Sequence, residues 1–452
     1  MNSFVPDLEK HFQTLSNSLF ENLKSGEELS LNLNAEESTF IRFNRAQVRQ
    51  NTFVDQRSLQ MQFLSNQRKV NFECSLTGDL ESDRKTTLSL LSRARQEAQI
   101  LPADEFIVPL ENRGESRNLH KGELPASSQV MENIVAAGRG SDFVGLLTSG
   151  PVVRATRNSK GQSHWFSTES FFIDYSLFTT NVDGENKAVK GVYAGSKWDQ
   201  EQFTSRLQTS RNQLSLTQRK SQVIKPGAYR TYLAPNALAE ICGMLSWNGL
   251  SFSAMKKGNC ALTKLYDQEK TLSNHFSLKE NFALGVSPQF NSLGEMAPTE
   301  LSLIEKGVLK NMLVSSRTEK EYGIKSNGAE AAMEGLRSPE IAGGEIPESE
   351  ILKHLDKGLY LSNLHYLNWS DVSHARLTGM TRYACFWVES GEIVGPIRDM
   401  RFDDSLYQIL GESLVGFTRE QHMDPLISTY MQREIGGKKI PGALLGQFSF
   451  TL

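Results

Sequence analysis

SLQMQFLSNQRKVNFEC, residues 58–74, is the stretch that decides the fold of the first part of the chain. Apolar and polar residues alternate on both sides of the turn-like segment 65–67, and LSLNL at 29–33 shows the same pattern. The apolar positions are Leu29, Leu31, Leu33, Leu59, Met61, Phe63, Val70, Phe72 and Cys74. A period of two is typical of a strand with one buried face. These runs therefore predict an antiparallel meander.

Two amphipathic segments flank this meander. Leucine and phenylalanine recur at steps of three and four over residues 6–25, and leucine and alanine do so over 79–100, where Leu101-Pro102 ends the pattern. Both segments are predicted to be helices. Helices beside an antiparallel sheet indicate an α+β fold. Residues 109–128 are polar and rich in glycine and proline, so a connecting loop is expected there.

The remainder of the chain divides at a turn. We expect a short helix at 130–137, several strands, and a long polar helix at 196–220, after which Pro226-Gly227 is the predicted boundary. The predicted domains are 1–225, an α+β domain, and 226–452, a mostly antiparallel β domain. In the second domain, glycine-containing turns at 305–307 and 389–391 predict hairpins.

Composition excludes some classes of function. The 452 residues carry a formal net charge of -3, so nothing marks a general polyanion binder, and no direct contact with nucleic acid is expected. No apolar run approaches the ~20 residues that cross a bilayer, and the N-terminus lacks the features of an export signal. We expect a cytoplasmic protein without membrane contact, whose four cysteines are reduced core thiols.

Common catalytic motifs are absent from the sequence. It contains no P-loop, no G-x-S-x-G, no C-x-x-C and no H-E-x-x-H. His365, His374 and Cys385 are zinc-ligand types within one strand-rich region, but their spacing matches no standard structural site. They stay as an alternative metal site.

Three segments together resemble one protein family. They are FIRFNRAQVRQ (40–50), FNSLGEMAPTELSLIEKGVLKNMLVSSRTEKEYGIKSNG (290–328) and RLTGMTRYACFWVESGEIVGPIRDM (376–400). Their order and spacing are similar to those of the TldD/PmbA family, the modulator-of-gyrase proteins classed with metallopeptidases. The chain looks more like the PmbA (TldE) branch than the TldD branch.

The resemblance implies a site in the second domain. In the TldD branch a helix carries H-E-x-x-x-H, whose histidines hold zinc together with a later cysteine, and whose glutamate serves as general base. The matching stretch here is AEICGM, so Ala239 and Met244 stand at the histidine positions while Glu240 and Gly243 match. An alanine methyl has no lone pair, and a thioether is a weak zinc ligand. We therefore expect an ordinary core helix without metal.

The resemblance also implies a role. PmbA-like chains pair with a TldD-like metallopeptidase in proteolysis and peptide maturation, acting on unfolded peptides. This chain is expected to be the subunit that binds no cofactor of its own, and zinc is expected in the TldD-like partner. The chain is expected to form a homo- or hetero-oligomer. Two alternatives stay open. One is an active hydrolase with an unrecognised His/Cys site, and the other is a homodimeric peptide-binding protein without catalysis.

Overall fold

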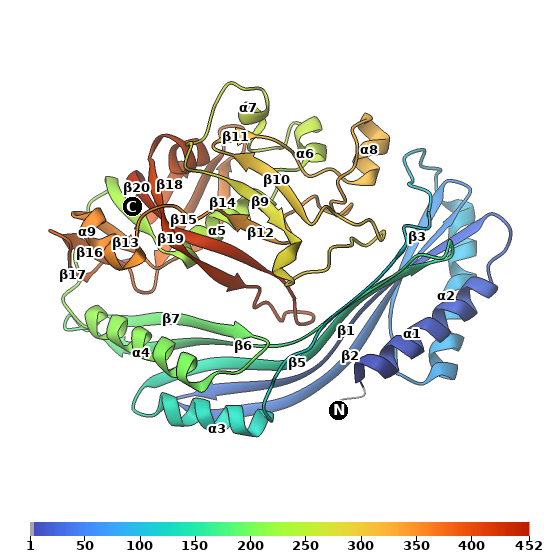
Figure 1. The fold of residues 1–452 in the computed structure, drawn as a ribbon, viewed down its shortest axis with the longest axis horizontal. Coiled ribbons are helices and arrows are strands. Elements are labelled where there is room, and N and C mark those ends of the chain that lie inside the picture. The colour runs from blue at the N-terminus through green and yellow to red at the C-terminus, as the bar shows by residue number, and fades with distance from the viewer. Residues whose placement is uncertain (1–3, 452) are drawn as a thin grey trace.

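The computed structural model describes residues 4–451, which form two large sheets facing one another (Figure 1). The N-terminal sheet has seven strands in the order β3-β2-β1-β5-β6-β4, with β7 paired to β6. The C-terminal sheet has 13 strands, and its longest path runs β11-β10-β9-β12-β20-β8-β13-β16-β17. The predicted α+β fold class is confirmed.

The elements up to the crossing between the sheets are α1 (Phe4–Glu21), β1 (Glu27–Asn44), β2 (Gln47–Ser65), β3 (Arg68–Ser75), α2 (Leu80–Ile100), β4 (Glu115–His120), α3 (Ser127–Gly138), β5 (Asp142–Asn158), β6 (Ser163–Thr180), β7 (Asn186–Gly195) and α4 (Gln200–Thr217). After the crossing come β8 (Gly227–Leu233), α5 (Pro235–Ser246), α6 (Phe252–Lys256), α7 (Thr263–Tyr266), β9 (Leu278–Asn281), β10 (Glu300–Glu305), β11 (Val308–Leu309), α8 (Ser316–Tyr322), β12 (Pro339–Ile341), α9 (Ile351–Leu355), β13 (Gly358–Leu361), β14 (Asn363–Asp371), β15 (Arg376–Arg382), β16 (Phe386–Glu389), β17 (Glu392–Pro396), β18 (Arg401–Ser405), β19 (Leu414–Pro425) and β20 (Gly437–Phe450). Short 3-10 turns lie at Phe282–Leu284 and Glu348–Glu350, and a π-helical turn lies at Gln408–Glu412.

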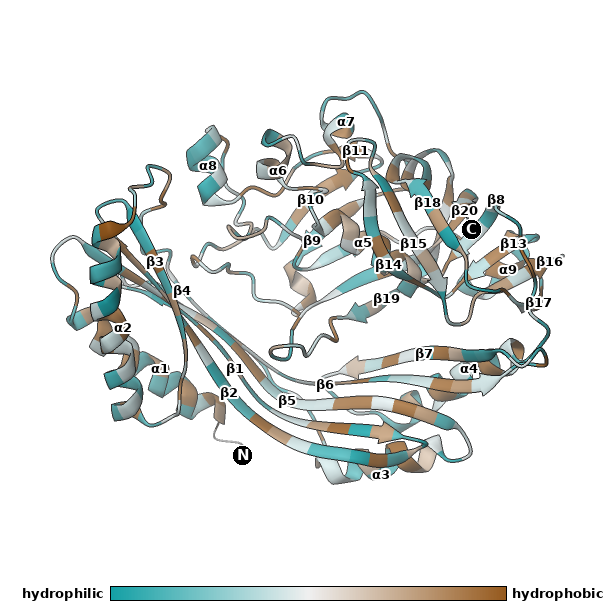
Figure 2. Ribbon diagram, turned by 180° about the vertical axis from the view of Figure 1, so that it is seen from behind, coloured by the Kyte–Doolittle hydropathy of each residue, from teal (hydrophilic) through white to brown (hydrophobic). Residues whose placement is uncertain are grey.

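The predicted meander is present with the expected register. Met61 of β2 lies opposite Leu31 of β1 and Phe72 of β3, so the alternating apolar residues meet on one face. Asn66 and Gln67 form the two-residue turn with φ of 49° and 56°, the left-handed geometry that suits a tight hairpin. Figure 2 shows hydrophobic and hydrophilic bands alternating along β1 and β2. Both strands continue well beyond the alternating runs, to 18 and 19 residues.

Among residues 4–451, the helices that pack on the N-terminal sheet lie on its convex face (Figure 1). Phe12 and Leu15 of α1 and Leu91 of α2 pack with Leu31 and Met61 at one end. Side chains of α3 and α4 form a second cluster at the other end of the same face. The opposite, concave face is turned toward the C-terminal sheet.

Several predicted boundaries are corrected by the structure. The segment 109–128 is not all loop, because β4 pairs in parallel with β6 over residues 115–120. This edge strand is exposed along most of its length and is held by main-chain hydrogen bonds, so it shows no hydrophobic alternation. The first helix ends at Glu21 rather than Ser25, and Gly26, with φ of +80°, lies in the turn before β1.

The C-terminal sheet is mostly antiparallel, with both predicted hairpins. β10 and β11 join through Lys306-Gly307, and β16 and β17 join through Ser390-Gly391. Two pairs are parallel instead, β8 with β13 and β12 with β20. Among residues 4–451, none of the helices combines the length and apolar character that a bilayer crossing requires.

The connection between β19 and β20 ties the two sheets together through Arg433. This side chain is only 2% exposed, and its guanidinium donates to the carbonyls of Gly150 (3.0 Å) and Ser170 (2.7 Å) of the N-terminal sheet. Its main-chain N–H donates to the carboxylate of Glu36, itself 2% exposed, at 2.9 Å. Burial lowers the pKa of Arg433 to about 10, so the side chain stays charged at neutral pH.

Glu340 of β12 should make stability depend on pH. Burial alone would raise its pKa, but hydrogen bonds from Asn281 (2.6 Å) and Lys439 (2.9 Å) outweigh it and lower the pKa to about 2. Because an unfolded glutamate titrates near pH ~4.3, the carboxylate stabilises the fold fully above about pH 5 and loses that contribution as the pH falls toward about 2. We expect Glu340→Gln to cost about 2 kcal/mol at pH 7, with the difference from the native chain shrinking on acidification. Urea unfolding between pH 7 and pH 3 measures this, and the exposed Glu81→Gln is the control. A difference that stays constant with pH would contradict it.

Candidate functional site

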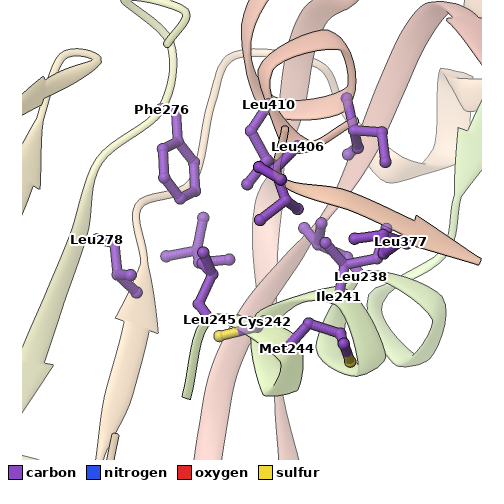
Figure 3. Packing of buried hydrophobic residues seen from close by; sticks show 14 of the residues in the cluster. Leu238, Ile241, Cys242, Met244, Leu245, Phe276, Leu278, Leu377, Leu406 and Leu410 are labelled. Atoms are coloured by element: carbon purple, nitrogen blue, oxygen red, sulfur yellow. The ribbon is translucent and has the colours of Figure 1, made fainter. Parts of the chain in front are cut away.

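Helix α5 holds the stretch that resembles the family's metal motif. Pro235 occupies its first turn, where the missing N–H is no loss, and the apolar residues repeat at steps of three and four. Leu238, Ile241 and Leu245 are at most 1% exposed and pack with residues of the C-terminal sheet. Figure 3 shows them directed into the cluster that includes Phe276, Leu278 and Leu377. The expected core helix is present.

The two positions where histidines would stand are part of this core. Ala239 is 2% exposed and Met244 is 5% exposed, and both belong to the same apolar cluster. Glu240 is exposed and Gly243 is half-buried, so they lie on the open side of α5. The helix thus presents one carboxylate outward, while an alanine methyl and a methionine thioether are packed away.

A group of charged side chains surrounds this open side. Asn236 of α5 donates to Asp424 of β19 at 3.2 Å, and Asp424 pairs with Lys438 of β20 at 3.4 Å. Facing them on the N-terminal sheet, Lys190 of β7 pairs with Asp174 of β6 at 3.2 Å. The junction between the two sheets is therefore lined by both signs of charge near Glu240.

Loss of hydration at this junction raises the carboxylate pKa values. It is the main cause for the half-buried Asp424 and Asp174, and also for Glu240, whose side chain keeps contact with solvent but has protein atoms of both sheets around it. In all three it outweighs the lowering effect of the nearby lysines. The positive charge of Lys190, on the N-terminal sheet, also acts to lower the pKa of both Glu240 and Asp424. The carboxylate of Glu240 accepts no hydrogen bond from, and forms no ion pair with, any described residue.

The residues around α5 do not fit a catalytic zinc. Such a site needs three protein donors, usually histidine, cysteine or carboxylate, that converge on one point. Within residues 4–451, no group of three or more histidine, cysteine, aspartate or glutamate side chains is arranged to hold a metal ion. The two lysine ammonium groups beside Glu240 and Asp424 would also repel a divalent cation. We derive no chemistry through a metal at α5.

The alternative set of His365, His374 and Cys385 does not come together. His365 lies near the start of β14 opposite Met380, while His374 lies in the turn after β14, roughly 20 Å further along the strand. The exposed His374 hydrogen-bonds Asp371 at 2.8 Å. The thiol of Cys385 is buried and donates to the carbonyl of Arg382 at 3.2 Å, and burial raises its pKa to about 11. An inert core thiol, as predicted, accounts for Cys385.

The middle family-like segment is a structural junction. Gly294 has φ of +75°, and a Cβ there would lie 1.8 Å from the amide nitrogen of Gln162, in the turn between β5 and β6. The positive φ favours glycine, and a larger residue would also have to displace the Gln162 side chain. Nearby, the amide of Asn291 donates to the carbonyl of Ala329 at 3.0 Å and to the carboxylate of Glu295 at 2.9 Å. Gly294 therefore serves packing against the turn of the N-terminal sheet, while Asn291 holds this segment to the loop at Ala329.

A cleft elsewhere in the molecule is a second candidate site, and the sequence did not predict it. A cleft of about 910 Å³ separates β2 and β3 from α6 and α8. Its walls come from seven separated parts of the sequence, and the amide side chains that line it belong to no local motif. The only sequence signal was that the polar faces of the alternating strands carry amides, as at Gln60, Gln62 and Asn71.

Comparisons with known proteins agree with the resemblance seen in the sequence. A family model described as the PmbA/TldA metallopeptidase C-terminal domain matches residues 226–451. A search of curated proteins finds no match. The fold is similar to that of TldE from Thermococcus kodakarensis, with a TM-score of 0.79 at 15% identity over 98% of this chain and 100% of the other.

Two further solved structures share the fold, and both are described as proposed modulators of DNA gyrase. The one from Thermotoga maritima gives a TM-score of 0.76 at 15% identity, over 98% of this chain and 100% of the other. The one from Bacteroides thetaiotaomicron gives 0.77 at 16% identity, over 98% of each chain.

Proposed function

Because the chain belongs to the PmbA/TldD family of metallopeptidase-related proteins, we propose that it is a PmbA/TldE-like subunit without zinc of its own, paired in the cytoplasm with a TldD-like metallopeptidase. The pair would act in proteolysis and peptide maturation on unfolded peptides. The zinc and the bond-breaking chemistry belong to the partner, and this chain supplies structure and walls that hold the substrate.

One observation carries this proposal. At the position of the family's metal motif, α5 buries Ala239 and Met244 in the core and leaves Glu240 as the sole carboxylate on its open side. A single carboxylate beside two lysines cannot replace three converging donors. The active-hydrolase alternative gains nothing from His365, His374 and Cys385, which lie apart.

The test is assembly followed by activity. The purified chain is mixed with a TldD-like metallopeptidase from the same organism, and the masses are measured by size-exclusion chromatography with light scattering. We expect a mixed oligomer that cleaves an unfolded protein such as casein, whereas this chain alone does not.

A matched pair of variants assigns the chemistry to one chain. Glu240→Gln in this chain should leave the rate of the pair within about twofold, because no reacting group is lost. The same change at the glutamate of the partner's H-E-x-x-x-H should lower the cleavage rate at least about a hundredfold, which is the scale expected when a general base is lost. Absence of any mixed species, or cleavage by this chain alone that Glu240→Gln removes, would contradict the proposal.

A further inference from the structure

The cleft between β2, β3 and the helices α6 and α8 has the dimensions of a binding site. Its volume of about 910 Å³ is within the range of about 300 to 1,000 Å³ that ligand sites occupy. It lies away from Glu240, beyond the C-terminal end of α5, where Asn248 contributes to its wall. Figure 1 shows α6 and α8 across from β3.

Amide side chains line both walls of this cleft. The amides are Asn32, Gln60, Gln62 and Asn71 on the N-terminal sheet and Asn248 and Asn259 on the opposite side. None of these six side chains hydrogen-bonds another group among residues 4–451. Each carboxamide offers two N–H donors and an acceptor oxygen, so the cleft presents many donors and acceptors that the protein itself does not use.

The spacing of these amides matches an extended polypeptide. Gln60 and Gln62 lie two residues apart on one face of β2, about 6.7 Å from one another, which is also the two-residue repeat of an extended chain. Asn32 lies opposite Gln60 in the register, and Asn71 lies opposite Gln62. The amides therefore form rows whose period equals that at which an extended peptide presents its main-chain groups.

The other residues that line the cleft favour recognition of a peptide's main chain over recognition of a charged group or stacking on an aromatic ring. Lys69, Glu73 and Lys257 bring both signs of charge. Arg317 is already paired with Asp104 at 2.5 Å and with Glu321 at 2.5 Å.

Neither aromatic ring of the cleft is available as a platform for a sugar or a base. The Phe72 ring lies beneath Arg93 of α2, with 5.1 Å from the guanidinium carbon to the ring centroid. The Phe106 ring lies against Arg317 at 5.5 Å.

Contacts across one end hold the walls in place. Besides the pair between Arg317 of α8 and Asp104, Lys320 of α8 donates to the carbonyl of Ile107 at 2.5 Å. Both Asp104 and Ile107 belong to the segment that follows α2. Because the walls are fixed before a ligand arrives, less conformational freedom is lost on binding.

We propose that this cleft binds an extended polypeptide through its main chain, with little dependence on side-chain sequence. The inference rests on the proposed function, and it names the place where this subunit holds substrate. Binding here needs neither zinc nor the partner's catalytic groups.

The experiment measures peptide binding by the full chain alone. The probe is a fluorescein-labelled 12-residue peptide of alanine, serine and threonine, read by fluorescence anisotropy. Its twin carries N-methyl groups on every second residue, which keeps the side chains but removes main-chain N–H donors. We expect saturable binding of the first peptide and at least tenfold weaker binding of the twin, because several hydrogen bonds are lost together.

Variants place the binding in the cleft. Gln60→Met with Gln62→Met keeps side-chain length but removes two amides, and should weaken binding roughly tenfold at an unchanged unfolding midpoint. Gln47→Met, on the same strand and outside the cleft lining, should bind as the native chain does. If the double variant folds poorly, the single variants Gln60→Met and Gln62→Met place the binding, while the N-methylated twin tests main-chain recognition on the native chain.

Three results would overturn the inference: no saturable binding by the native chain, equal binding of the two peptides, or full binding by a folded double variant. Assembly with the TldD-like partner is scored separately. Lost binding with intact assembly overturns only this cleft, whereas peptide binding without assembly overturns only the proposed function.

Discussion

Replacing both Ala239 and Met244 by histidine is expected to lower the free energy of unfolding by about 3 kcal/mol without creating a zinc site. Both positions are within the apolar cluster around α5, so each imidazole would enter a packed, dry environment without a hydrogen-bond partner. Chemical unfolding followed by circular dichroism, together with metal analysis of the folded fraction, measures both effects.

The matched control lies on the same helix. Glu240→His introduces the same side chain on the open side of α5, where a substitution should change stability by no more than about 0.5 kcal/mol. If the double histidine variant were as stable as this control and bound zinc stoichiometrically, α5 would be a metal site that lost only its ligands, and our description of its packing would be wrong.

Arg433→Met is expected to destabilise the chain by about 3 to 5 kcal/mol. The change removes three hydrogen bonds from the guanidinium to Gly150 and Ser170, and leaves buried acceptors on the N-terminal sheet without donors. It also removes the positive charge that acts on the buried carboxylate of Glu36. The segment between β19 and β20, which carries Tyr430 at 94% exposure, should then detach and become sensitive to protease.

Urea unfolding measures the loss of stability, and limited proteolysis measures the detachment of the segment between β19 and β20. Arg84→Met removes the same charge from the exposed face of α2 and should be nearly neutral. Cleavage between residues 426 and 436 that is no faster in Arg433→Met than in Arg84→Met would show that this arginine does not hold the sheets together.

The sequence correctly predicted those elements that depend only on local residue patterns. The meander, with Met61 between Leu31 and Phe72, follows from a period of two and a two-residue turn. The α2 helix begins where Asp79 caps it, its side chain accepting from the Ser82 N–H at 2.9 Å, and its predicted end is also correct. The core face of α5 follows from the repeat of Leu238, Ile241 and Leu245.

Features that depend on distant contacts were not predictable in this way. β4 has no hydrophobic pattern because its main chain, rather than its side chains, holds it to β6. Arg433 looks like a surface arginine in the sequence, and only the fold buries it against Gly150 and Ser170. The charged group around Glu240 and the amide-lined cleft each combine segments from both sheets, so neither leaves a motif.

Metal analysis of the purified assembly tests the central claim most directly. The two chains are co-purified, and zinc is counted in the intact assembly. The ratio of the two chains in the same sample is then measured under denaturing conditions. The zinc content of this chain purified alone is the comparison. We predict about one zinc per TldD-like chain in the assembly and less than a tenth of an equivalent on this chain alone. Near-stoichiometric zinc on this chain alone would contradict the account, because it would require a set of donors that the described residues do not bring together.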